Sequence, residues 1–133
     1  MTLLAGVVVV AFGVFLIAFT GVAFAKPVLA RQLLMAFASS ARTHYLEQAL
    51  RLVIGAALIV LSPAMWQANI FWLVGWAIVV GSAALMLVPW QWHHQFGERV
   101  LPMLVRQLRL YAVALFAFGA LLLYGVFAGG SAA

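Results

Sequence analysis

Charged side chains occur in only two short stretches of this chain. The seven basic and two acidic residues all lie within positions 26–51 and 98–109. The three remaining segments carry no formal side-chain charge and are mostly apolar. A soluble domain covered by such segments would expose an extremely apolar surface, whereas a membrane protein needs charges only in its connections on one face. The pattern therefore predicts an all-α integral membrane protein.

The composition limits the chain to a single membrane domain. Hydrophobic residues make up 68% of the 133 positions and charged residues only 7%, whereas a typical soluble domain is about 25% charged. A helix needs about 20 apolar residues to cross a bilayer, so four spans and their connections fill residues 1–133. The chain has no cysteine, which excludes disulfides and thiolate metal ligands.

Four apolar segments are predicted to cross the membrane as helices. They are residues 3–24, 45–62, 69–88 and 108–127. Residues 23–25 resemble a signal-peptide cleavage site, but no basic residue precedes the apolar run and Lys26 follows it, so we expect a first transmembrane helix. The connections 26–42 and 89–107 mix basic and apolar residues, and they are predicted to form short amphipathic helices at the cytoplasmic interface.

The order of these segments indicates two similar halves. Each half reads as an apolar helix, a proline, a basic connection and a second apolar helix, with Pro27 and Pro89 lying 62 positions apart. The tripeptide Leu-Arg-Leu around Arg51 recurs around Arg109, 58 positions later. We therefore expect two helical hairpins forming a weak parallel repeat. Because the basic residues flank one side of the spans, we expect a multi-pass protein of the cytoplasmic (inner) membrane with both termini in the periplasm.

The second span contains the candidate intramembrane polar site, which consists of His44, Glu47 and Arg51. The uncharged run 52–61 would rise only about 15 Å, half of the hydrocarbon thickness. The helix must therefore begin earlier and carry Glu47 and Arg51, four residues apart on one face, into the inner leaflet. In one interpretation Arg51 reaches the headgroups and Glu47 neutralises it. In the other, the pair faces the helix bundle and binds an ion, a proton or a partner helix, and His44 shares a proton with Glu47.

Two further sets of residues are candidates for contact with lipid or with other helices. Basic, histidine and tryptophan side chains in the connections are predicted to lie at the headgroup interface: Lys26, Arg31, Arg42, Trp90, Trp92, His93, His94, Arg99, Arg106 and Arg109. Small residues let helices approach closely in lipid, although glycine is also common in membrane helices generally. The candidates for helix packing are Gly6, Gly13, Gly21, Gly75, Ala77 and Gly81.

The sequence offers no constellation that would support catalysis or bind a cofactor. The adjacent His93 and His94 point in different directions on a helix or a strand, so neither geometry easily aims both at one metal. A nucleophile with a neighbouring base and a glycine-rich phosphate loop are both missing from the sequence. We therefore expect no enzymatic activity, no metal and no cofactor.

These features predict a non-enzymatic accessory or scaffold subunit, which associates with the bilayer and with itself or other membrane protein subunits. The basic pI of about 10.9 is explained by topology and anionic lipid rather than by nucleic acid. One alternative is a small transporter or channel that uses Glu47, Arg51 and His44. A second alternative is a cofactor-binding redox subunit with His44, His93 or His94 as ligands.

Overall fold

The computed structural model describes residues 2–37 and 41–132 of the chain, and this part is helical without any β-strand. Its elements in chain order are α1 (Thr2–Ala25), α2 (Pro27–Phe37), α3 (Ala41–Leu61), a 3-10 turn (Ser62–Ala64), α4 (Ala68–Leu87), α5 (Trp90–Arg106) and α6 (Leu108–Ala132). Helices α1, α3, α4 and α6 are long and apolar enough to cross a membrane. They correspond to the four predicted spans, so the prediction of four helices able to cross a membrane is confirmed.

The breaks between helices follow from local backbone chemistry. Pro27 has no amide proton and starts α2 immediately after Lys26, whose amide still donates to the Val22 carbonyl at 2.7 Å. Gln67 adopts a left-handed conformation with φ of 56° and separates the 3-10 turn from α4. The second span, Arg42–Ala64, begins well before its uncharged run. This start brings the polar residues of α3 into the spanning helix.

Two pairs of helices are held together by close backbone contact at glycines. In the α1–α6 pair, a Cβ atom placed on Gly119 would lie 2.9 Å from the Gly13 carbonyl oxygen. In the α3–α4 pair, a Cβ atom on Gly75 would lie 2.9 Å from the Gly55 carbonyl oxygen. Real Cβ atoms almost never approach another atom as closely as this. Each pair therefore depends on glycine for its close approach.

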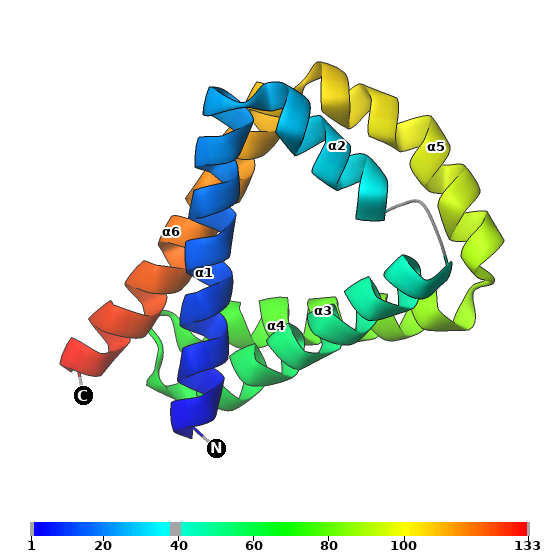
Figure 1. Cartoon of the computed structure of the whole chain (residues 1–133). Helices are drawn as coiled ribbons and strands as arrows, with labels where there is room; N and C mark the ends of the chain where they lie inside the picture. Colours follow the sequence, from blue (N-terminus) through cyan, green and yellow to red (C-terminus); the bar gives the residue numbers. More distant parts are fainter. Residues whose placement is uncertain (1, 38–40, 133) are drawn as a thin grey trace.

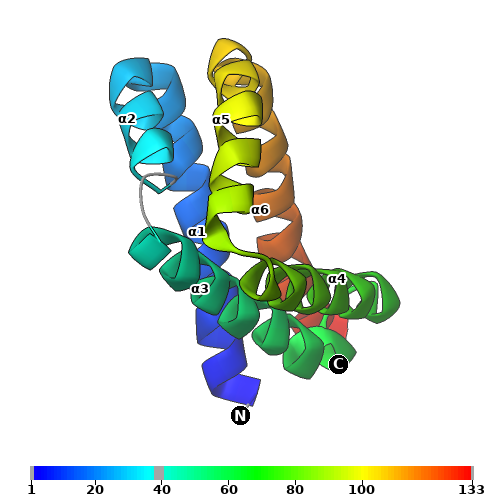
Figure 2. The ribbon, with the colours of Figure 1, turned by 90° about the vertical axis from the view of Figure 1, so that its right-hand side faces the viewer.

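The two pairs lie across one another and do not stand side by side, as both views show (Figures 1 and 2). They meet near the start of α1, the end of α6 and the turn between α3 and α4, and they separate toward α2 and α5 (Figure 1). The most extensive contacts are those between α3 and α4 and between α1 and α6. The predicted hairpins, in which each half would pair with itself, are therefore not confirmed.

The hydrophobic core lies where the two pairs meet. Its fully buried members include Val9 of α1, Leu58 of α3 and Leu122 of α6, each with no exposed surface. The turn between α3 and α4 is tied to this region, because the Trp66 amide donates to the Gly125 carbonyl of α6 at 2.9 Å. Most other apolar side chains of the four long helices face outward. Between 17% and 33% of the residues in their most apolar windows are buried, which suits helices surrounded by lipid.

Candidate functional site

The three predicted polar residues of α3 divide into a buried part and a charged, partly exposed part. His44 is buried, and its ring lies 4.9 Å from the ring of Tyr45, measured between centroids. One turn along the helix, an Arg51 Nη2 donates to Glu47 Oε1 in an ion pair. The side chains of Arg51 and Glu47 are 49% and 26% exposed, respectively. The charges of Glu47 and Arg51 thus neutralise one another on a partly exposed side of α3, whereas His44 is buried within the protein.

Gln48 is a further polar residue of α3, and it was not among the predicted site residues. Its side chain is completely buried. Both amide atoms, Nε2 and Oε1, are buried without a hydrogen-bond partner among the described residues. It follows His44 by four residues, so the two side chains share one face of the helix. An unpartnered amide is costly in a membrane span, because the surroundings offer no water.

The register of the α3–α4 pair shows which residue of α4 is level with Gln48. Gln48 precedes Gly55 by seven residues, and Ser82 follows Gly75 by seven residues. Since the two helices run antiparallel from the Gly55–Gly75 contact, Ser82 lies opposite Gln48 about 10 Å further along the pair. Ser82 is also buried, with 2% of its surface exposed. The inner half of the α3–α4 interface therefore contains at least two buried polar side chains.

The α1–α6 pair has a polar contact at the matching distance from its glycines. The Thr20 hydroxyl lies 2.9 Å from the Leu16 carbonyl and 3.0 Å from the Ala112 carbonyl of α6. Thr20 follows Gly13 by seven residues, and Ala112 precedes Gly119 by seven. The hydroxyl thus links the two helices and fixes their register.

The charged pair of α3 also acts on α6. Tyr111, which is partly buried near the start of α6, lies within electrostatic range of both Arg51 and Glu47. The charged pair of α3 therefore lies within electrostatic range of the α1–α6 pair.

The predicted interfacial residues lie in or beside α2 and α5, at the end of the molecule opposite the chain termini (Figure 1). Those whose side chains are described are exposed to the surroundings: Lys26, Arg31, Arg42, Trp92, Arg99, Arg106 and Arg109. The side chains of Trp90, His93 and His94 lie outside the described part. Apolar residues of α2, such as Val28 and Leu33, are exposed together with Arg31, so the expected amphipathic character of the connections is not confirmed.

The small residues predicted to pack helices have different surroundings. Gly13 and Gly75 lie in the close contacts described above, opposite Gly119 and Gly55, which the sequence analysis did not single out. Gly6 is half-buried, and a Cβ atom there would lie 4.0 Å from Leu61. A Cβ atom on Gly21 or Gly81 would meet nothing within 4 Å, and Ala77 is exposed.

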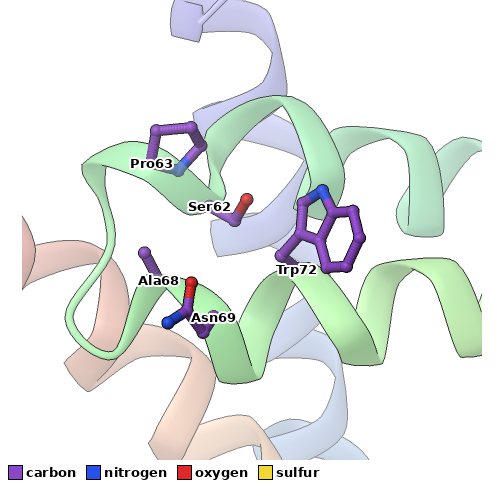
Figure 3. A pocket seen from close by; sticks show the side chains of 5 residues that line it. All are labelled: Ser62, Pro63, Ala68, Asn69 and Trp72. Atoms are coloured by element: carbon purple, nitrogen blue, oxygen red, sulfur yellow. The ribbon is translucent and has the colours of Figure 1, made fainter.

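A shallow pocket lies at the other end of the α3–α4 pair (Figure 3). It has a volume of about 400 Å³ and is lined by Ser62, Pro63, Ala68, Asn69 and Trp72. The Ser62 hydroxyl donates to the Ile59 carbonyl at 2.9 Å, which leaves the exposed Asn69 amide as the other polar side chain at the rim. The lining is mainly apolar, and it contains no pair of groups suited to acid–base chemistry.

Within the part of the chain that the structure describes, no three histidine or acidic side chains converge on a point that could hold a metal. Comparisons of the chain with protein-family models, curated proteins and solved structures found no match. The fold and the residues at the site therefore define the class of this protein. It is an all-helical protein with four helices able to span a membrane and a buried polar face on α3.

Proposed function

We propose that this protein is a non-enzymatic accessory or scaffold subunit of the cytoplasmic membrane, which associates with its own copies or with a larger membrane complex. The observation that carries the proposal is the open face of α4 at Ala77 and Gly81. Ala77 is exposed, and a Cβ atom on Gly81 would meet nothing within 4 Å. The chain uses such small residues twice for its own helix contacts. This face offers the same kind of close approach to a helix of another protein.

The proposal includes the orientation of the protein in the membrane. The termini and the α3–α4 turn lie at one end of the molecule, and α2 and α5 lie at the other (Figure 1). The basic residues occur at Lys26 before α2, in α2, in α5, at the first turns of α3 and α6 (Arg42 and Arg109), and at Arg51 in the middle of α3. The positive-inside rule then assigns α2 and α5 to the cytoplasmic face, in contact with anionic lipid, and both termini to the periplasm.

We also propose that the chain is a parallel repeat, α1–α2–α3 followed by α4–α5–α6. An offset of 62 positions relates Gly13 to Gly75 and Thr20 to Ser82, as it relates the two prolines. In α3 and α6, the last helices of the two halves, an offset of 64 relates Gly55 to Gly119. We align these helices by this glycine match and not by the Leu-Arg-Leu tripeptides, which lie 58 positions apart. Each pair then joins the first helix of one half to the last helix of the other, which explains why neither half pairs with itself.

A matched pair of substitutions tests the assembly proposal. Ala77→Leu adds bulk to the open face of α4, whereas Ala114→Leu makes the same change at an exposed position of α6. Native mass spectrometry of the protein, purified gently from its own membranes, measures the assembly. We expect a defined complex in the wild type and in Ala114→Leu that is lost in Ala77→Leu. A wild-type protein that is entirely monomeric would refute the proposal, as would a complex that survives Ala77→Leu.

A further inference from the structure

Comparison of the two helix pairs shows whether the buried polar residues of α3 are needed for packing. In the offset of 64 positions, His44 corresponds to Leu108 and Gln48 to Ala112. All four residues are buried to a similar degree: 5% and 0% of the surface is exposed in α3, and 4% and 0% in α6. One pair therefore packs at these positions with apolar side chains alone. Packing the α3–α4 pair does not require an imidazole and an amide there.

The buried amide must be satisfied by something, because an unpartnered amide in an apolar interior is strongly unfavourable. Neither Nε2 nor Oε1 of Gln48 has a hydrogen-bond partner within the described ranges 2–37 and 41–132. The group that satisfies it must be small, because the Gln48 side chain is wholly enclosed. It must both donate and accept hydrogen bonds, because the amide does both.

The charges around the site favour an uncharged ligand. Glu47 and Arg51, the nearest full charges on α3, are paired with one another. Gln48 itself is neutral, and in the register of the pair Ser82 of α4 adds a hydroxyl opposite it. An ion would therefore lose its hydration without meeting an opposite charge. Buried water, by contrast, typically makes about three hydrogen bonds to buried polar groups that lack protein partners.

We propose that Gln48, His44 and Ser82 form a polar binding site inside the α3–α4 pair, and that its ligand is water. The site lies two helical turns from the Gly55–Gly75 contact, on the side of α2 and α5. It makes the inner half of α3 a hydrated position within an otherwise apolar span. The inference does not rest on the proposed assembly, since it concerns the interior of one chain.

Solid-state NMR of the protein in liposomes can test the site directly. Glu47-Gln48 is the single Glu-Gln dipeptide of the chain, so a sample made by cell-free synthesis with ¹³C-carbonyl glutamate and ¹⁵N,¹³C-glutamine assigns Gln48 without any substitution. We expect a cross-peak between water and the Gln48 side-chain NH₂ that is lost in D₂O.

A different set of cross-peaks would contradict the inference. If the Gln48 NH₂ correlates with Ser82, with another protein group or with lipid, and not with water, the inference is wrong. Two variants give a second measurement. A direct bond from Gln48 to Ser82 would make the effects of Gln48→Leu and Ser82→Ala on the unfolding midpoint in SDS non-additive, which a double-mutant cycle measures. For a water site we expect Gln48→Leu to leave the midpoint unchanged or higher, because no bond within the protein is lost.

Discussion

The glycine contact between α3 and α4 can be tested with two identical substitutions on one helix. In Gly75→Ala the new Cβ atom would lie 2.9 Å from both the Gly55 carbonyl oxygen and Ile59 Cγ1, and 3.1 Å from the Ile59 amide nitrogen. Two of these three atoms belong to the backbone, so they cannot rotate away. In Gly81→Ala the same methyl group would meet nothing within 4 Å. The two variants therefore introduce the same methyl group and differ only in the atoms that this group contacts.

The expected difference in stability follows from two effects of the added methyl group, one on helix packing and one on helix propensity. Atoms pack best at about 3.5–4.0 Å, so Gly75→Ala must push α3 and α4 apart by about 0.5 Å or more. Overpacking of this kind costs about 1–3 kcal/mol. Alanine in place of glycine also stabilises a helix by about 1 kcal/mol, but this term is common to both variants. We therefore expect Gly75→Ala to be less stable than Gly81→Ala by about 1–3 kcal/mol.

The assay is unfolding of each variant by SDS in mixed micelles, followed by far-ultraviolet circular dichroism. The free energies of unfolding of Gly75→Ala and Gly81→Ala are compared with that of the wild type. Equal stabilities for the two variants would refute the close contact between α3 and α4. If Gly81→Ala alone were destabilised, the open face of α4 would instead be packed within the chain.

Two further predictions use the same unfolding assay. Thr20→Val replaces the hydroxyl with a methyl group of similar size, removes the bond to the Ala112 carbonyl and should lower stability by about 0.5–1.5 kcal/mol; no change would mean that this bond does not hold α1 against α6. For the Glu47–Arg51 pair, which is partly exposed, a double-mutant cycle with Glu47→Gln and Arg51→Gln should give a coupling energy of about 0.3–0.5 kcal/mol. A coupling several times larger would show that the pair is buried in the membrane-bound protein.

Sequence reasoning identified part of the polar site because charged residues are conspicuous in an apolar chain. The short uncharged run after Arg51 predicted an early start for this helix, and α3 does begin at Ala41. Gln48 did not stand out, because an uncharged polar residue beside charged ones fits an interfacial helix end equally well. Its importance depends on burial, and burial depends on which face of α3 meets α4.

The glycines show the same division. Gly13 and Gly75 were predicted to pack helices, but their partners Gly55 and Gly119 were not. A glycine contact forms between two helices in a particular register. The sequence of one helix shows its own glycine but not the glycine that it will face. For the same reason the hairpins predicted from the order of segments differ from the pairs found in the fold.

The sequence by itself determined that the chain is helical and that it has four segments able to cross a membrane. This follows because the transfer of a helix into lipid depends on the summed polarity of one continuous segment. Only the tertiary structure decided which helices pair. Apolar side chains gain nothing from leaving lipid for another helix, so pairing depends on close backbone approach at a few glycines and on bonds such as that from Thr20 to Ala112.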